Sequence, residues 1–459
     1  MWKDRSPCPC WRTETHLDQV LMRDLEKIVG ETSVRTDEET LKVFRSSRGA
    51  VPEAVVRVGS TEDAAAVVRL ANKRRTPFIL ADQMGPVARS EDSSGSSFAL
   101  DFSMMNKVRE MRFTDLFMTT EPGATLADLD FALRPAHFFF PPEPTAGRSS
   151  TIGRVVLVNP VHPGAEKYGS FRDYVLSVEA VTPSGEAVKL GAKTLKNSSG
   201  LQIERFLSGS GGLLGIPTWI TLAVKPSPRS TLLFTAVFDS VSDGMSAARG
   251  IGSSPVVPSS LELLDIGWAE LCGQPLESGQ LALHVELSGH PEAVMSEADV
   301  VARICRATSA SRVERTRDRR LIGERRSQRR FHQMFRVGEG TLFQSFTLPA
   351  SAGDEMLRSI AEMCGDGGQV FGTLAFSVFG SLLFSVAARS TNHAGAEEGM
   401  SAIARRALSS GGYLTPPEWR TGPVWDRRCG MTIPGDRLSA GLKEALDPVS
   451  VLNAGGMSM

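Results

Sequence analysis

Cysteine has the widest range of chemistry among the residue types of this sequence, and its six copies are scattered. They stand at positions 8, 10, 272, 305, 364 and 429. Only Cys8 and Cys10 are close together, and a single Cys-x-Cys without a second pair nearby is a weak metal or redox motif. Because this spacing provides no disulfide framework for a long chain, a reducing, cytoplasmic location is expected.

Arginine gathers in one segment, residues 312–336, which reads RVERTRDRRLIGERRSQRRFHQMFR. Its guanidinium groups could form a docking surface for an acidic partner. The alternative is the solvated face of a surface helix, which carries such charge without a binding role. The sequence leaves both interpretations open.

Composition limits the partners that the chain can have. Lys and Arg total 51 against 52 for Asp and Glu, so a net charge of −1 gives no reason to expect nucleic acid or an acidic membrane surface. A hydrophobic content of 41% suffices for sizeable cores, and 459 residues indicate two or three domains. The N-terminus has no apolar run typical of a signal peptide.

The stretch from Val370 to Ala388 carries no charge and has about the length of a membrane-spanning helix. Its residues alternate, however. The apolar set, expected on one side, is Leu374, Phe376, Val378, Leu382, Phe384 and Val386, and the polar set, expected on the other, is Thr373, Ser377, Ser381 and Ser385. A period of two, with Gly372 and Gly380 as breaks, predicts buried strands.

The elements that must position these residues are typical of a chain that mixes helices and strands. Residues 18–48 are expected to be helical. A strand at 51–58, a helix over 64–73 capped by Ser60, and a strand at 76–81 predict a βαβ unit. Short strands separated by Gly- and Pro-rich turns follow from 98 to 225, where Lys225-Pro-Ser-Pro predicts a domain boundary. Residues 230–390 then predict a second α/β domain, and no internal repeat is visible.

Short motifs follow one another in a characteristic order over residues 118–228. They are Glu121-Pro-Gly-Ala-Thr, Phe140-Pro-Pro-Glu-Pro-Thr, Ser150-Thr-Ile-Gly, Asn159, Lys167-Tyr-Gly, Asp173-Tyr-Val-Leu, Thr182-Pro-Ser-Gly and Gly209-Ser-Gly-Gly-Leu-Leu-Gly. Their order and spacing resemble the FAD-binding domain of the vanillyl-alcohol oxidase superfamily of FAD-linked oxidases. The likeness is greatest to the glycolate oxidase D subunit and the D-lactate and D-2-hydroxyglutarate dehydrogenases, and it covers residues 24–455.

The resemblance implies an α+β chain: a PCMH-type FAD-binding fold of two α+β subdomains, a ferredoxin-like α/β cap domain and a short C-terminal helical return. The expected boundaries are 1–48 for lead-in helices, 49–228 for the FAD-binding domain with a split near 98, 229–415 for the cap domain, and 416–459 for the returning segment. FAD is the implied cofactor. The implied partners are another flavin subunit, an iron–sulfur subunit or a second copy of the chain, with peripheral contact to the inner membrane through them.

In that family, glycine-rich turns cradle the FAD pyrophosphate, because backbone N–H groups close on phosphate only where no side chain intervenes. The matching residues here, implied to bind the cofactor, are Gly85, Thr151, Ile152, Gly153, Asn159, Tyr168, Gly169, Gly209, Ser210, Gly212, Gly215 and Ile216. The first turn, Arg-Gly-x-Gly-Thr in the family, reads Ala81-Asp-Gln-Met-Gly85. Asp82 and Met84 therefore replace glycines, and a carboxylate at this place repels a pyrophosphate.

The second turn departs as well, since Thr-Ile-Gly-Gly becomes Thr151-Ile-Gly-Arg154. Arg154 could supply a cation for an anionic ligand or fill the space that a flavin would occupy. His162, which stands in the stretch that reads Asn-x-Gly-Gly in the family, is interpreted as a satisfied core or surface histidine.

The substrate side of the family uses a His-Ala-Gly-Asp-Gly-Asn-Leu-His motif, which falls here on residues 378–385 without any histidine. No metal site is therefore expected. In the family's Glu-His-Gly region, Glu418 stands as the surviving carboxylate, the one catalytic candidate, but the histidine that would accept a proton is missing. Arg154 and the arginines of 319–326, Arg325 among them, are the candidates for binding a substrate carboxylate.

Three functions stay open. The chain could be a non-catalytic or attenuated subunit of a redox complex, an active FAD-dependent 2-hydroxy-acid dehydrogenase of glycolate or D-lactate type with a divergent site, or a binder of another small anion. Departure at five separated functional turns, within a framework that is kept, favours the first.

Overall fold

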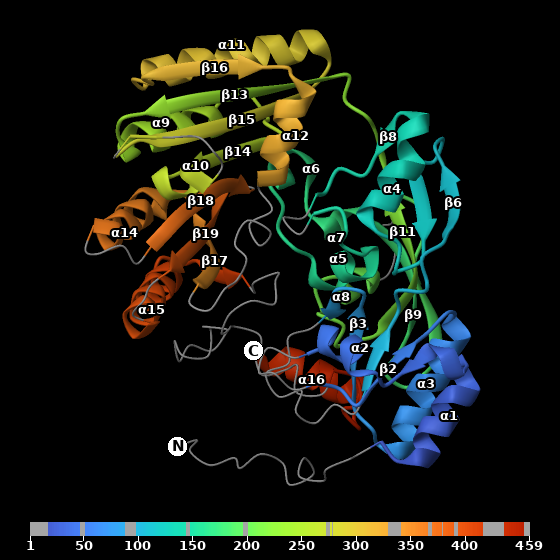
Figure 1. Cartoon of the computed structure of the whole chain (residues 1–459). Coiled ribbons are helices and arrows are strands. Elements are labelled where there is room, and N and C mark those ends of the chain that lie inside the picture. Colours follow the sequence, from blue (N-terminus) through green and yellow to red (C-terminus); the bar gives the residue numbers. More distant parts are fainter. Residues whose placement is uncertain are drawn as a thin grey trace.

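The computed structural model describes residues 17–45, 51–87, 98–143, 147–195, 201–271, 276–277, 279–328, 341–365, 370–378, 380–389, 393–415 and 436–453. They form an N-terminal domain, blue to green in Figure 1, and a C-terminal domain, yellow to orange. The last helix returns to the N-terminal domain.

The first sheet of the N-terminal domain has a parallel centre. Its strands in spatial order are β1 (Val34–Arg35), β2 (Ala54–Arg57), β5 (Phe98–Asp101), β3 (Phe78–Asp82) and β4 (Gly85–Pro86). β2, β5 and β3 run parallel, and helix α3 (Thr61–Arg74) connects β2 to β3. Ser60 caps α3 by accepting the N–H of Asp63 at 3.0 Å. The predicted βαβ unit is confirmed, with β5 inserted between its two strands. The lead-in forms α1 (Gln19–Val29), the 3-10 helix η2 (Glu31–Ser33) and α2 (Glu38–Val43).

The second sheet of this domain is antiparallel. Its strands in spatial order are β10 (Ala187–Gly191), β9 (Val175–Val181), β11 (Ile216–Ala223), β7 (Phe117–Thr120) and β6 (Val108–Arg112). The helices beside it are α4 (Leu126–Leu133), η4 (Arg134–Ala136), α5 (Ile152–Val158), α6 (Ala165–Tyr168), α7 (Phe171–Tyr174) and α8 (Glu204–Leu207), and a small ladder pairs β8 (Phe138–Phe139) with β12 (Lys225–Pro226). The chain passes from the first sheet to the second between Asp101 and Val108, and one hydrophobic core joins both sheets.

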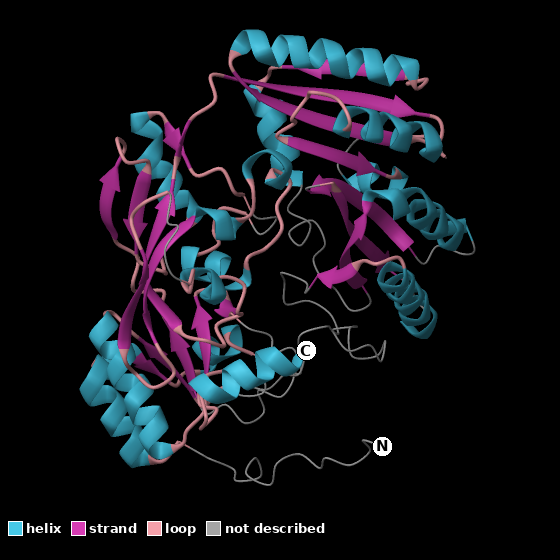
Figure 2. Ribbon diagram, turned by 180° about the vertical axis from the view of Figure 1, so that it is seen from behind, coloured by secondary structure: helices cyan, strands magenta, loops and turns pink. Residues whose placement is uncertain are grey.

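The C-terminal domain is built on one antiparallel sheet. Its strands in spatial order are β16 (Arg312–Thr316), β13 (Ser230–Phe238), β15 (Leu281–Gly289), β14 (Ser260–Leu264), β18 (Val370–Val378), β19 (Ser381–Arg389), β17 (Thr341–Pro349) and β20 (Tyr413–Thr415). Its helices are α9 (Val241–Gly252), α10 (Ile266–Leu271), α11 (Pro291–Ala307), α12 (Arg319–Gln328), η5 (Ala350–Ala352), α14 (Gly353–Gly365) and α15 (His393–Ser409). Figure 2 shows α9, α11, α14 and α15 on the side of the sheet turned away from the N-terminal domain. The predicted α+β class is confirmed.

A duplication is present in this domain that the sequence does not reveal. The order β13-α9-β14-β15-α11-β16 is a ferredoxin-like βαββαβ unit, and β17-α14-β18-β19-α15-β20 repeats it. The two units join edge to edge through β14 and β18. The absence of an internal repeat therefore holds for the residues but not for the topology.

The uncharged stretch 370–388 lies in the strands β18 and β19, as its alternation predicts, and the two strands pair as a hairpin. One detail is corrected: the register pairs Ala375 with Phe384 and Thr373 with Val386, so the even positions of β18 do not share a face with those of β19. Across the turn at Gly380, each even-numbered residue of β18 is paired with an odd-numbered residue of β19, as Leu374 is with Ser385, and paired residues lie on the same face of the sheet. Within the described residues, no helix is long and apolar enough to cross a membrane.

The arginine-rich segment is also not a single helix. It begins as the edge strand β16, turns, and continues as α12, while residues 329–336 lie outside the described part. Exposed arginines of the segment form ion pairs with neighbouring carboxylates, such as Arg315 with Asp299 at 3.2 Å. Such pairs are typical of a solvated surface.

The last helix of the described residues is α16 (Asp436–Leu446), and residues 447–453 lie against the first sheet. The N–H of Phe78 donates to Val451 O at 2.8 Å, and the N–H of Asn453 donates to Phe78 O at 2.8 Å. The returning segment thus extends the parallel centre beside β3.

Candidate cofactor site

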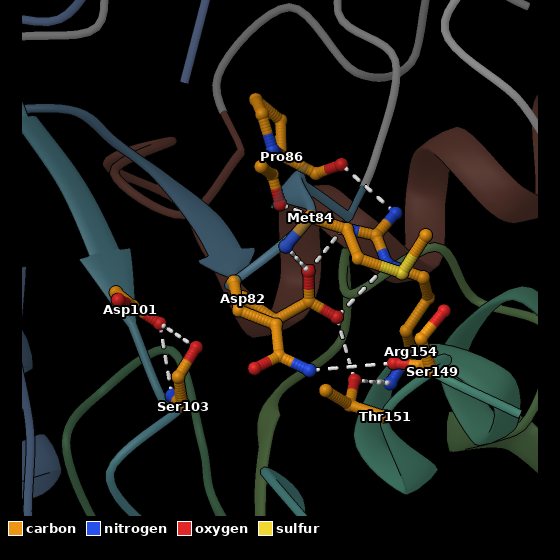
Figure 3. Close-up of polar contacts among 10 residues, drawn as sticks. Asp82, Met84, Pro86, Asp101, Ser103, Ser149, Thr151 and Arg154 are labelled. Carbon is orange, nitrogen blue, oxygen red and sulfur yellow. Dashed lines mark hydrogen bonds and ion pairs between the residues drawn. The ribbon is translucent and has the colours of Figure 1, made fainter. Parts of the chain in front are cut away.

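The carboxylate of Asp82 lies fully buried at the end of β3, where the first turn begins. It accepts two bonds from the Arg154 guanidinium, from Nη2 at 2.6 Å and from Nε at 2.9 Å. It also accepts the hydroxyl of Thr151 at 2.5 Å and the backbone N–H of Met84 at 2.8 Å (Figure 3). Four donors converge on this one carboxylate, so its charge is fully compensated.

The remaining hydrogen bonds of the Arg154 guanidinium are made to the backbone of the same turn. Its Nη2 also donates to Gly85 O at 2.7 Å and its Nη1 donates to Pro86 O at 3.1 Å. Only 11% of the side chain is exposed. Of the two interpretations of Arg154, this geometry favours a residue that fills the cradle over a cation held ready for an anionic ligand.

The second turn is the N-terminus of α5, with Thr151 as its cap. Free N–H groups at a helix start can bind phosphate. Here Ile152 donates to Ala124 O at 2.8 Å, Gly153 to Pro122 O at 2.7 Å, and Arg154 to the Thr151 hydroxyl at 3.3 Å. A Cβ on Gly153 would lie 2.7 Å from Pro122 and 2.8 Å from the ring of Phe102, so packing alone requires glycine.

The third turn, 209–215, closes on itself and on the C-terminus. Gly209 donates to Val156 O at 3.0 Å, Gly211 to Leu157 O at 2.8 Å and Leu213 to Ser210 O at 3.1 Å. Gly212 N–H reaches the Ser210 hydroxyl at 3.3 Å. The remaining predicted positions of this turn, Gly215 and Ile216, lead into β11, where Ile216 is buried and pairs with Val181.

The returning C-terminal segment clamps this turn with buried polar side chains that the sequence did not single out for this role. Asn453 donates to Gly211 O at 3.2 Å and Gly212 O at 3.0 Å, and its Oδ1 accepts the N–H of Leu80 at 2.6 Å. Lys443 donates to Leu213 O at 2.9 Å and to the Asp447 carboxylate at 2.7 Å. Asn453 thereby ties the first turn's strand to the third turn.

Three further predicted residues make structural contacts. Asn159 caps the end of α5 at φ +49°, and its Oδ1 accepts the N–H of Arg172 at 3.0 Å. The Tyr168 hydroxyl lies 2.8 Å from the Ser288 hydroxyl of β15, in the other domain. Gly169, at φ +84°, offers its carbonyl to His162 Nε2 at 2.7 Å.

His162 is 1% exposed, as expected for a core histidine. Burial lowers its pKa to about 4, although the bond to Gly169 opposes the shift. The ring is therefore neutral at pH 7, with Nε2 as the protonated nitrogen because it faces a carbonyl.

Two of the residues predicted on the substrate side cannot be located in the structure. Glu418 lies outside the described residues, as does the side chain of Arg325. Its neighbour Arg326 is placed: Nη2 and Nε donate to the two oxygens of Glu286 at 2.6 Å and 3.0 Å. In the described part of the chain, no group of three or more His, Cys, Asp or Glu side chains could hold a metal ion.

The chain is similar to known proteins over both of its domains. Residues 52–191 match the FAD binding domain, and residues 227–415 match the C-terminal domain of FAD linked oxidases. The chain belongs to the FAD-linked oxidases.

Among curated relatives of this FAD-linked oxidase, the glycolate oxidase subunit GlcD of Bacillus subtilis is 25% identical over 423 residues, which cover 89% of each chain. The D-lactate dehydrogenase of Anaerostipes hadrus is 32% identical over 214 residues, 47% of this chain and 45% of the relative. Among solved structures, p-cresol methylhydroxylase with substrate bound superposes with a TM-score of 0.78 at 14% identity, covering 95% of this chain and 96% of that one. The last likeness shows the shared fold.

FAD is the cofactor that an FAD-linked oxidase would hold, and its pyrophosphate needs free backbone donors and space. In this chain the donors named above are bonded within the protein, and a carboxylate–guanidinium pair lies between the first and second turns. The three turns, in the arrangement described, do not fit a pyrophosphate.

Proposed function

We propose that this chain is a non-catalytic or attenuated member of the FAD-linked oxidases that serves as a subunit of a redox enzyme complex. The single observation that carries the proposal is the buried pair of Asp82 and Arg154 in the pyrophosphate cradle. The fold is kept as a scaffold, while the polar groups of the cradle bond to one another.

The energetic argument concerns what FAD would have to displace. A pyrophosphate brings negative charge to within contact distance of Asp82, and moving Arg154 aside would leave that carboxylate buried without its partner. Separating a buried ion pair costs about 3–5 kcal/mol, which corresponds to roughly a hundredfold or more in affinity. FAD binding is therefore expected to be weak in the wild-type chain.

The substrate side supports the same proposal. Oxidation of a hydroxy acid needs a base near the hydroxyl group. Residues 378–385, where the family's histidine motif falls, contain neither histidine nor carboxylate. Glu418 is left as a carboxylate without a neighbouring histidine in the sequence.

The partners we propose are a second flavin subunit, an iron–sulfur subunit or another copy of the chain. The relative from Bacillus subtilis is by its name a subunit of glycolate oxidase, and it matches this chain over 89% of both lengths. A cytoplasmic complex, peripheral to the inner membrane through its partners, is part of the same proposal.

An active FAD-dependent 2-hydroxy-acid dehydrogenase is the second candidate. It is favoured by the matches to both family domains and by the identity to a D-lactate dehydrogenase. In that case FAD would supply the hydride-accepting chemistry when bound, and the chain would have to reorganise its first turn to hold it.

Purification from the native source separates the two candidates. The proposal expects a protein with little absorbance near ~450 nm, where oxidised flavins absorb. It also expects no reduction of an artificial electron acceptor by the isolated chain with glycolate or D-lactate, and co-purification with a flavin or iron–sulfur protein. A yellow, solitary chain that oxidises either acid would overturn it.

A further inference from the structure

The strand β16 lies at the edge of the sheet in the C-terminal domain, next to α11 in Figure 1. One of its sides pairs with β13, from Arg312 opposite Val237 to Thr316 opposite Leu233. Within the described residues, no strand or loop forms backbone hydrogen bonds with its other side. Such an edge presents a row of N–H and C=O groups with which an extended segment of polypeptide can pair. The free side of β16 is therefore able to accept one more strand.

The charges on β16 itself are compensated. Arg315 pairs with Asp299 of α11 at 3.2 Å, and Arg312 lies 3.6 Å from Glu314 within the same strand. Proteins can protect an exposed edge from pairing with another chain by placing charged side chains on the edge strand. In β16 each arginine has a carboxylate beside it, so the strand itself does not repel an incoming segment of either charge.

Two arginines near the start of β16 have no such carboxylate. Arg303 and Arg306 stand four and seven residues after Asp299 on α11, and this spacing places all three on one side of the helix. That side is the one next to β16, because Asp299 pairs with Arg315. Both arginines are exposed, and neither forms an ion pair within the part of the chain that the structure describes. The side of α11 beside the edge is thus positively charged.

The end of β16 has the same character. Arg317 and Arg319 follow the strand directly, are exposed, and form no ion pair with any described residue. Asp318 stands between them, and its carboxylate accepts the backbone N–H of Arg320 at 2.8 Å. A segment laid along β16 therefore meets uncompensated arginines at both ends of the strand, in a chain whose net charge is −1.

The edge and its arginines together favour one kind of ligand. A strand edge binds polypeptide, because its N–H and C=O groups have the spacing of those on another strand. The arginines favour a segment that carries carboxylates. A second copy of the chain suits the edge poorly, since two β16 strands side by side would bring their arginines together. A nucleic acid would satisfy the arginines but leave the backbone groups of the edge unpaired.

We propose that β16 accepts an extended, acidic segment of a partner protein as an additional strand of the sheet. Side chains that face one another on neighbouring strands lie about 4.5–5.5 Å apart. Val313 and Arg315 point to the α11 side of the sheet, so carboxylates at every second position of the incoming segment lie on the side of Arg303 and Arg306. The inference rests on the proposed function, because the partner is taken to be a subunit of the same redox complex.

Fluorescence anisotropy with a labelled peptide and the full chain tests the docking surface. The peptide alternates Glu with Thr over the length of β16, and saturable binding is expected with a dissociation constant below about 1 mM. A peptide that alternates Glu with Pro has the same charge but lacks an N–H at every second residue, so it should bind at least about tenfold more weakly. Absence of saturation by the Glu-Thr peptide overturns the inference, as does equal affinity for the Glu-Pro peptide.

Charge reversal locates the surface. The double variant Arg303→Glu/Arg306→Glu should weaken binding of the Glu-Thr peptide about tenfold or more, because two attractions become two repulsions. Arg23→Glu/Lys73→Glu makes the same change of charge on exposed residues of α1 and α3 and should leave the affinity within about twofold, since distant charges are screened. If the two double variants bind the peptide equally, the assigned surface is wrong. Thermal unfolding confirms that both are folded.

Two further outcomes would assign the edge to another ligand and overturn the inference. A single-stranded oligonucleotide with the charge of the peptide that binds at least as tightly would show that the surface recognises charge alone. A dimer of the chain that Arg303→Glu/Arg306→Glu dissociates in sedimentation would show that a second copy occupies the edge. The proposed function fails separately: a colourless, inactive chain that does not bind the peptide overturns only the docking surface, whereas a yellow, active chain that binds it overturns only the proposed function.

Discussion

Asp82 Oδ1 and Arg154 Nη2 lie 2.6 Å apart in the interior of the N-terminal domain, one from the first turn and the other from the second. Each is a departure from the family's glycine-rich pattern when taken alone. Together they form one compensated pair, since the carboxylate that would repel a phosphate is neutralised by the arginine that replaces a glycine. The two substitutions therefore form a single structural unit.

A double-mutant cycle measures that unit. Arg154→Met alone should lower the free energy of unfolding by about 3–5 kcal/mol, because it leaves a buried carboxylate with only neutral donors. The double variant Asp82→Leu/Arg154→Met should cost clearly less than the sum of the single changes. Urea denaturation gives these values. The exposed pair Arg406 and Glu355 offers the control, where Arg406→Met should cost about 1 kcal/mol or less.

The substitution Gly153→Ala tests whether the second turn requires glycine because of packing within the protein or because of a bound cofactor. Its Cβ would lie 2.7 Å from Pro122, and the crowding should destabilise the chain by about 1–3 kcal/mol without any cofactor present. Gly441→Ala in α16 meets nothing within 4 Å and should instead stabilise by up to about 1 kcal/mol. A Gly153→Ala chain as stable as the wild type would show that packing does not require this glycine.

Stability should fall in mild acid because of His162. Its pKa is about 4 in the folded chain against 6.5 when unperturbed, so between these values the unfolded chain binds more protons. The contribution of His162 to the free energy of unfolding is complete above pH 6.5 and decreases, by about 3 kcal/mol at most, as the pH falls towards 4.

The variant His162→Gln keeps a donor for Gly169 and removes the titrating group. It should lose less stability than the wild type between pH 7 and pH 4.5, as followed by thermal unfolding. His290→Gln, which changes an exposed histidine, should retain the wild-type dependence. An unchanged acid profile in His162→Gln would show that another group causes it.

Asn453 holds the C-terminal segment against the first and third turns with three hydrogen bonds. Asn453→Ala should reduce the free energy of unfolding by about 2–4 kcal/mol, since it leaves the buried N–H of Leu80 without a partner. Glu444→Ala, on the exposed face of α16, should change it by no more than about 0.5 kcal/mol. Chemical denaturation compares the two, and similar values would contradict the clamp.

The sequence could predict the βαβ unit over 51–81 and the strands within 370–388, because local periodicity and capping determine them, whereas the α+β class followed from the resemblance to the FAD-linked oxidases. The sequence could not predict the register of the β18–β19 hairpin, because a turn that is one residue longer or shorter changes which positions share a face. The sequence also could not reveal the duplicated topology of the C-terminal domain, because two βαββαβ units can have the same fold without any similarity between their sequences.

At the site, the sequence indicated that Asp82 and Arg154 depart from the glycine-rich pattern. It could not show that they meet, because they are separated by many residues and come together only through the packing of β3 beside α5. One signal was available: opposite charges appeared at two turns that the family brings to the same phosphate. The roles of Lys443, Asn453 and Glu286 carried no such signal, as each depends on contacts between distant segments.

Titration of FAD into the purified chain tests the central claim most directly, with wild type compared to the variant Asp82→Gly/Met84→Gly/Arg154→Gly. Because both charges are removed together, the variant retains no unpaired buried ion, and circular dichroism checks its fold. The closed cradle predicts that the wild type binds FAD only weakly and that the variant binds it with measurably higher affinity. A wild-type chain that binds one FAD as tightly as the variant, or more tightly, would contradict it.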